Sequence, residues 1–314
     1  MSRDDLRASS PTETPHYTNA HRALLQSFLS RPIQTVDALK PTLAAILTAQ
    51  NPSRPTLPGD ITPSTLPPLL TTLNTKLAPL DYELRPTRSQ SPSRTQLYAL
   101  VNTSSDAFTQ LATSFTPDEI AYVKRLLDAI FIENDTRGKE VLAVNTMRAK
   151  QLAKAPPRQS QRRRKEEEGP VVNSIKIEAA ERVVEALISQ SFLSRSRGNY
   201  ISLAPRGVLE LRGYLKEMYN EEGDGGVVRI RDCYGCAEIV TVGVRCGERG
   251  CGCRLHEQCA VGVLRGEARR RCPVCKGGWG GEWVGEKAAT AGGGGRRGTR
   301  GRGEELEEEE EEDE

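Results

Sequence analysis

The sequence has few aromatic residues and no cysteine before position 233. Phe, Tyr and Trp make up 5% of the 314 residues, and hydrophobic residues make up 37%. These values are low for a uniformly globular chain, so we expect folded cores separated by linkers. No apolar stretch approaches the length of a membrane span, and the first ten residues lack the apolar segment of a signal peptide. The sequence therefore predicts a soluble, intracellular protein that makes no membrane contact.

The formal net charge of +2 conceals an uneven distribution of charge. Ten of the eleven residues 304–314 are acidic, which leaves 44 basic and 32 acidic residues in the rest of the chain. That remainder carries a charge of +12 and can attract nucleic acid. The glycine- and arginine-rich segment and the acidic run after position 284 cannot bury a core, and we expect them to be disordered.

The first half of the chain has helical periodicity followed by strand signals. Helices are expected over 21–30, 36–50, 62–80 and 116–131, and strands over 82–86 and 95–102. Pro41 is expected to kink or divide the second helix. Three helices followed by a β-hairpin is the element order of a winged helix. After a charged, proline-rich linker, a helix from about residue 175, a hairpin with a Gly-Asn turn and another helix repeat this order.

These signals predict an α+β chain with tandem winged-helix domains and a small cross-brace zinc domain. The expected segments are a disordered leader (1–17), a first winged-helix region (18–153), a charged linker (154–173), a second winged-helix domain (174–226), the zinc domain (227–284) and a disordered tail (285–314).

The zinc domain is predicted from cysteine spacing. All eight cysteines follow the pattern C-x2-C-x9-C-x4-C-x-C-x2-H-x2-C-x12-C-x2-C, which runs from Cys233 to Cys275. In a reducing compartment, CxxC pairs with an interposed histidine indicate metal ligands rather than disulfides. If the pairs alternate between two ions, one zinc is held by Cys233, Cys236, His256 and Cys259. The other is held by Cys246, Cys272 and Cys275, with either Cys251 or Cys253.

Two such sites would be structural. Four protein ligands leave no open position on either ion, so neither can activate water as a hydrolase metal does. Metal binding would instead supply folding free energy to a segment with little apolar core. The pattern favours a protein-binding surface, with no small-molecule substrate.

Several separated blocks resemble the family of non-structural maintenance of chromosomes element 1. The zinc-domain blocks are CYGC, RLHEQC and CPVCKGGW, and the upstream blocks are HRALLQSFLSR, PLDYELR, FTPDEIAYVKRLLDAIF and GNYISLAPRGVLELRGYL. The resemblance runs from about residue 18 to Trp283 and includes a variant RING domain. PHD fingers share the ligand order, but they usually carry a tryptophan where this chain has Arg270.

The resemblance implies a subunit of the complex built on the fifth and sixth structural maintenance of chromosomes ATPases. Its winged-helix region would bind a MAGE-type subunit, and the pair would engage the kleisin subunit. Its RING-like domain would act as an E3 ubiquitin transferase with a ubiquitin-charged E2, assisted by the MAGE-type partner. The implied setting is nuclear chromatin and the repair of DNA by recombination. The alternative is a non-catalytic adaptor that binds DNA or whose zinc domain stabilises the assembly.

The resemblance also implies roles for individual residues. It makes Cys251 a ligand of the second zinc and leaves Cys253 as the spare cysteine. Candidates for contact with E2 or ubiquitin are Ile239, Val240, Pro273, Val274 and Lys276, although apolar residues beside zinc loops commonly shield the sites. Separately, the basic side chains near the second hairpin are candidates for DNA contact, with solvated surface as the alternative: Arg195, Arg197 and Arg206.

Overall fold

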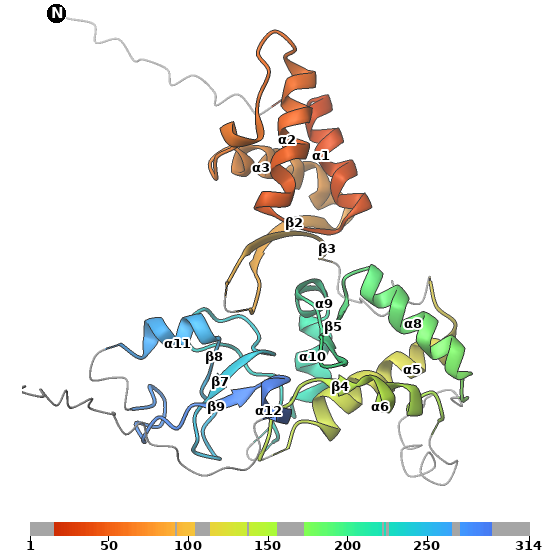
Figure 1. Cartoon of the computed structure of the whole chain (residues 1–314), viewed down its shortest axis with the longest axis vertical. Coiled ribbons are helices and arrows are strands. Elements are labelled where there is room, and N and C mark those ends of the chain that lie inside the picture. Colours follow the sequence, from red (N-terminus) through yellow and green to blue (C-terminus); the bar gives the residue numbers. More distant parts are fainter. Residues whose placement is uncertain are drawn as a thin grey trace, which may run out of the picture.

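The computed structural model describes residues 16–103, 114–155, 173–265 and 271–290, apart from residues 92, 137, 222, 224 and 225. Most of the expected leader, linker and tail therefore lies outside the described residues. No helix in this part of the chain is long and apolar enough to cross a bilayer. The described elements form three units in chain order (Figure 1).

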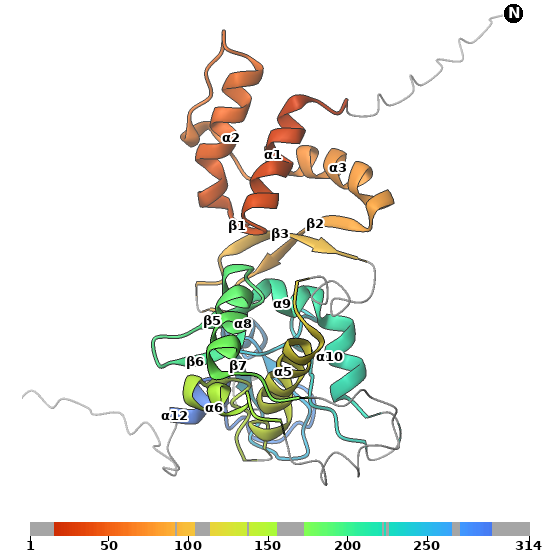
Figure 2. The same cartoon turned by 90° about the vertical axis from the view of Figure 1, so that its right-hand side faces the viewer.

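The first unit consists of three helices on one face of a small sheet (Figure 2). Its elements are α1 (Asn19–Ser30), β1 (Ile33–Thr35), α2 (Val36–Gln50), η1 (Pro58–Asp60), α3 (Leu66–Leu77), η2 (Ala78–Leu80), β2 (Tyr82–Arg88) and β3 (Gln96–Asn102). The central strand β3 pairs antiparallel with β1 and β2. The helices and the sheet enclose a leucine-rich core that includes the fully buried Leu24, Phe28 and Leu73.

Local signals account for the helix α2. It begins where the Thr35 side chain accepts a hydrogen bond from the Ala38 amide, and it ends at Gln50. The helix passes through Pro41 without being divided, contrary to one of the two outcomes expected there. Proline removes one hydrogen bond from a helix interior. The fully buried Leu39 and Leu43 on either side hold this segment against the core.

The second unit surrounds another three-stranded sheet. Its elements are α5 (Pro117–Asp128), the π-turn η3 (Ala129–Glu133), β4 (Val144–Asn145), α6 (Thr146–Gln151), α8 (Ile177–Ser189), β5 (Leu193–Arg195), β6 (Tyr200–Leu203), α9 (Pro205–Glu210) and α10 (Arg212–Tyr219). The order of the sheet is β4-β6-β5. The start of α5 is fixed by a reciprocal cap in which Thr116 and Glu119 each accept from the other's backbone amide.

This packing differs from the expected domain boundaries. The sequence predicts that the first region extends to residue 153, but β4 pairs with β6. In addition, Tyr122 and Leu126 of α5 lie in one core with Val183 and Leu187 of α8. Residues 117–153 therefore pack with the elements after the linker. The reason is a pairing between strands that are distant in sequence, which helical periodicity does not reveal.

The third unit is the cysteine-rich domain. It contains β7 (Gly243–Arg245), β8 (Arg254–Leu255), α11 (Glu257–Val263), β9 (Glu282–Val284) and α12 (Lys287–Thr290), with β7 between β8 and β9 in the sheet. The helix α12 and the buried Ala288 lie in the segment that was expected to be disordered from residue 285. The ammonium of Lys287 lies 4.4 Å from the centre of the Trp283 ring and anchors this helix to β9.

The second and third units share one hydrophobic core. The cluster that contains Leu126 and Val183 continues into Ile239, Leu255 and Val284 of the cysteine-rich domain. The first unit has a core of its own. Apart from a small separate cluster of buried cysteines in the third unit, the described residues therefore have two hydrophobic centres, although their elements group into three units.

Candidate metal centres

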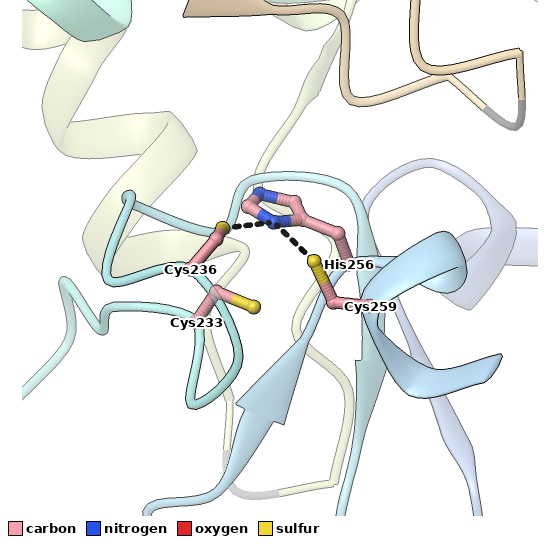
Figure 3. Close-up of side chains that lie close together, drawn as sticks. All are labelled: Cys233, Cys236, His256 and Cys259. Carbon is pink, nitrogen blue, oxygen red and sulfur yellow. Dashed lines mark hydrogen bonds between the residues drawn. The ribbon is translucent and has the colours of Figure 1, made fainter. Parts of the chain in front are cut away.

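The first cluster gathers four side chains from a loop and a helix start. Cys233 and Cys236 lie on the loop before β7, His256 immediately precedes α11, and Cys259 lies on α11 (Figure 3). Their candidate ligand atoms all lie within 4.8 Å of one another. His256 Nδ1 is 3.3 Å from Cys236 Sγ and 4.0 Å from Cys259 Sγ. Nδ1 is thus the ring nitrogen that faces the thiols.

The second cluster contains only cysteines. Cys246, Cys251, Cys272 and Cys275 also lie within 4.8 Å of one another. The Sγ atoms of Cys246 and Cys275 are 3.7 Å apart, and those of Cys251 and Cys272 are 3.6 Å apart. Tetrahedral zinc with Zn–S bonds of about 2.3 Å places its sulfurs about 3.8 Å apart. The donor atoms therefore fit a zinc ion.

The two CxxC turns have the same backbone geometry. The residue after each turn, Ala237 or Lys276, has a left-handed backbone, with φ of 58° and 61°. Its amide donates to the carbonyl of the first cysteine of the turn, at 2.8 Å for Cys233 and 3.0 Å for Cys272. Left-handed backbone disfavours residues with a Cβ, so its use at both turns indicates that the metal-binding conformation is imposed by the surroundings.

Hydrogen bonds lower the pKa of one thiol in each cluster, which favours the thiolate that binds metal. Burial tends to raise the pKa of Cys233, but hydrogen bonds from His256 and from the backbone lower this pKa to about 6. At Cys272, burial again opposes backbone hydrogen bonds from Cys275 and Val274, which lower its pKa to about 6. Each cluster thus offers a thiolate near neutral pH, and zinc displaces the protons of the other thiols on binding.

Cys253 is buried beside the second cluster but is not one of its four ligands. Its amide donates to Cys251 Sγ over 3.4 Å, and its carbonyl accepts from the Cys246 amide. Burial raises the pKa of the Cys253 thiol to about 12. The backbone of Cys253 is therefore bonded to the ligand segment, and burial keeps its thiol protonated.

The ligand segments alternate along the chain between the two clusters, which is the cross-brace arrangement. The two clusters fit two structural zinc ions, so the prediction of two zinc sites is confirmed. Four protein ligands at each site leave no position for a substrate.

The candidates for E2 contact divide into two groups. Ile239 and Val240 are only 1% and 4% exposed, so in this conformation they form part of the core rather than a contact surface. Val274 is 50% exposed, and Lys276 is exposed with its ammonium donating to the Pro273 carbonyl over 2.8 Å. Only the second CxxC turn presents its candidates to solvent.

The three arginine candidates for DNA contact also differ in accessibility. Arg197 is exposed, and Arg195 is paired on the surface with Glu185. The Arg206 side chain is 17% exposed, pairs with Glu210 and lies 4.5 Å from the Phe192 ring centre. Arg206 is therefore part of the packing around α9 and does not face a ligand.

Two contacts of the cysteine-rich domain have no signal in the sequence. Glu140, from the loop before β4, accepts hydrogen bonds from the buried Arg245 and Arg254. Gln90, at the tip of the β2–β3 hairpin, bonds to the backbone of residues 239–242. Both partners lie more than 100 positions from the loop or strand they contact, and neither occurs in a recognisable motif.

Comparison with known proteins assigns the family. Residues 21–211 match the family model described as "Nse1 non-SMC component of SMC5-6 complex", and residues 233–275 match a RING-like domain model. The chain belongs to the Nse1 family. The resemblance stated from the sequence is thereby confirmed.

The similar Nse1 proteins are distant relatives. The "Non-structural maintenance of chromosomes element 1 homolog" of Homo sapiens is 24% identical over 211 residues, covering 66% of each chain. The homolog of Xenopus tropicalis is 26% identical over 207 residues, covering 66% of this chain and 65% of the relative. The chain thus spans just under two thirds of the length of these relatives.

A solved structure has the same fold. A chain of a structure described as "Nse1-Nse3-Nse4 complex" aligns with a TM-score of 0.64 and 18% identity. The alignment covers 84% of this Nse1-family chain and 98% of the other. The likeness supports the arrangement of the elements over most of the chain.

Proposed function

We propose that this Nse1-family chain is a RING-type E3 ubiquitin-protein transferase and an adaptor subunit of the SMC5-6 complex. The observation that carries the proposal is the pair of closed, interleaved Cys/His clusters within a segment that matches a RING-like model. Closed sites serve to hold a binding surface in place. A RING surface that binds a ubiquitin-charged E2 is the function that best fits such an arrangement.

The proposed mechanism requires no nucleophile from this chain. The zinc ions would hold the two CxxC turns in place, and the exposed surface of the second turn would contact the E2. Val274 supplies an exposed apolar side chain, and Lys276 supplies a cation held against the Pro273 carbonyl. Holding the E2–ubiquitin thioester in one orientation beside a substrate lysine accelerates transfer by proximity.

We expect Val274→Ala to slow ubiquitin discharge from a charged E2 about three- to tenfold, as truncation of an interface anchor does. The matched control is Val261→Ala on α11, since Val261 is 63% exposed but lies outside both CxxC turns. Discharge would be measured with a panel of E2 enzymes, with and without the MAGE-type partner. Equal rates for wild type and both variants would exclude contact through the second turn, and no discharge above the partner alone would exclude transferase activity.

We further propose that the first and second units are winged-helix domains that bind partner proteins. The first unit has three helices followed by a β2–β3 hairpin, and the second has helices followed by a β5–β6 hairpin. The partners would be the MAGE-type and kleisin subunits, a proposal supported by the family match and by the likeness to a chain from an "Nse1-Nse3-Nse4 complex". The setting would be the nucleus and chromosomes, in DNA repair by recombination.

Co-expression tests the proposed partnership. Tagged chain should retain both the MAGE-type and the kleisin subunit through size-exclusion chromatography in roughly 0.5 M salt. Interactions between surface charges are already screened at about 0.1 M, so retention at this salt concentration indicates a specific interface. The matched control is Val261→Ala, an exposed substitution on α11, and a zinc-ligand variant is unsuitable because the second unit shares its core with the zinc domain. Failure of the wild-type chain to retain either subunit would contradict the adaptor proposal.

A non-catalytic adaptor is the second candidate function, and the burial of Ile239 and Val240 favours it. In this reading the zinc domain stabilises the assembly, and Arg195 and Arg197 remain the accessible candidates for DNA contact. The ubiquitin-discharge measurement distinguishes this function from the transferase.

A further inference from the structure

The tip of the β2–β3 hairpin reaches from the first unit to the cysteine-rich domain. Figure 1 shows the hairpin extending from below α1–α3 towards the region of α11 and β8. We call residues 88–91 and 93–96 the hairpin tip and residues 233–242 the first zinc loop. The contact between them joins two parts of the chain that have separate hydrophobic cores.

Gln90 of the hairpin tip makes four hydrogen bonds to the first zinc loop. Its Nε2 donates to the Ile239 carbonyl over 2.9 Å. Its Oε1 accepts from the amides of Thr241 and Val242, at 2.8 and 2.9 Å, and from the Thr241 hydroxyl at 3.1 Å. The amide side chain therefore uses both its donor and its acceptor on the backbone of one short segment.

This contact is linked to the first metal centre. The Ile239 carbonyl that accepts from Gln90 lies 3.3 Å from His256 Nε2, the ring nitrogen directed away from the thiols. Second-shell partners of this kind fix the orientation of a metal-binding histidine. Gln90 thus contributes to the position of the loop segment that supports a zinc ligand.

The helix α10 also holds the first zinc loop, near its middle. Arg212 donates to the Glu238 carboxylate over 2.9 Å and to the Ala237 carbonyl over 3.0 Å. Lys216 pairs at 2.6 Å with Asp232, the residue immediately before the loop. The hairpin tip and α10 together hold the loop in place, with Ile239 and Val240 turned into the core.

The contact between the hairpin tip and the loop is polar and incompletely packed. A cleft of about 410 Å³ lies between them, lined on the hairpin side by Arg88, Ser89, Ser91 and Gln96 and on the other side by α9 and by residues of the zinc domain such as Glu238 and His256. Because the first unit has its own core, the hairpin tip can withdraw without exposing a shared hydrophobic centre. The contact can therefore break and re-form while the core of the first unit stays intact, and we call it the latch.

We propose that Gln90 latches the first zinc loop in a closed conformation, and that an E2 gains the full RING surface only when the hairpin tip withdraws. This inference rests on the proposed transferase function. In the closed conformation the side chains of Ile239 and Val240 belong to the core shared by the second and third units, so opening of the loop requires them to leave that core after Gln90 releases the backbone beside them. A partner that engages the first unit and moves the hairpin would thereby raise the affinity for E2.

The test compares Gln90→Leu and Gln90→Glu with Ser93→Ala in the full chain. Leucine removes all four hydrogen bonds, whereas glutamate keeps the acceptor for Thr241 and Val242 but loses the donor to Ile239. Ser93 is an exposed residue of the same turn whose hydroxyl bonds to Ser91 and Thr95. Two zinc ions per chain and unchanged near-UV circular dichroism would establish that each variant is folded.

Hydrogen exchange and E2 binding are the two measurements. In Gln90→Leu, the Thr241 and Val242 amides should exchange about tenfold faster, since the closed state loses its specific hydrogen bonds. Binding of a ubiquitin-charged E2 should become about three- to tenfold tighter, because the fraction of competent chains rises. Gln90→Glu should show a smaller change in both quantities, and Ser93→Ala should match wild type.

The outcomes separate the latch from the transferase function. Unchanged amide exchange in Gln90→Leu would overturn the latch. Faster amide exchange with unchanged E2 affinity would overturn the proposal that Gln90 controls E2 binding. In that case, binding of the E2 by wild type would still support the transferase proposal. Absence of E2 binding by every protein would overturn the transferase proposal and, with it, the gating role of Gln90.

Discussion

Replacing Cys251 with serine should remove about one zinc ion per chain, whereas Cys253→Ser should leave both ions in place. Cys251 Sγ lies 3.6 Å from Cys272 Sγ and belongs to the second cluster, and Cys253 lies outside that cluster. A serine hydroxyl is a poor ligand at neutral pH and leaves the site with three thiolates. The domain should lose much of its order with the ion, because metal binding supplies its folding free energy.

The two cysteines form a matched pair for this experiment. They are separated by one residue and are 7% and 2% exposed, so both substitutions act on buried thiols of the same segment. Zinc content would be measured by atomic emission on purified protein. Both tryptophans, Trp279 and Trp283, lie in this domain, so their fluorescence reports its unfolding. Loss of zinc from Cys253→Ser with full content in Cys251→Ser would reverse the ligand assignment.

Glu140→Ala should destabilise the region containing the second unit and the zinc domain by about 3–5 kcal/mol. The Glu140 carboxylate accepts from Arg245 Nη1 over 3.0 Å and from Arg254 Nε over 2.7 Å. Both arginines are 5% exposed. Removal of the carboxylate leaves two cations in the interior without their shared anion, and desolvation makes this costly.

Glu133→Ala is the control for this charge cluster. Glu133 pairs with Arg148 through both carboxylate oxygens, but their side chains are 46% and 45% exposed. Its loss should cost less than about 1 kcal/mol, as for other surface pairs. Urea unfolding followed by tryptophan fluorescence, with zinc held constant, would give both values. Equal costs for the two glutamates would show that the buried cluster contributes no more than a surface pair.

Local signals predicted the elements and the metal sites better than the arrangement of the units. The Thr116 cap and the proline after it mark the start of α5, and the cysteine spacing marks two zinc sites, because these features depend on neighbouring residues. The burial of Ile239 and the contacts of Gln90 and Glu140 depend on how distant segments meet. The short strands β1, β4 and β9 likewise have too few residues to produce a periodic signal.

The core shared by the second and third units determines the order in which parts of the chain can fold during synthesis. The first unit closes its own core with residues up to Leu100, so it can fold soon after its hairpin leaves the ribosome. The core of the segment from Tyr122 to Tyr219 is completed by later residues such as Ile239 and Leu255, which lie between the metal ligands, and Val284, which lies beyond the last of them. In a nascent chain the core of this middle segment therefore stays incomplete until the last cysteines emerge and bind zinc. The supply of zinc then limits the folding of the second and third units together, and not of the final domain alone.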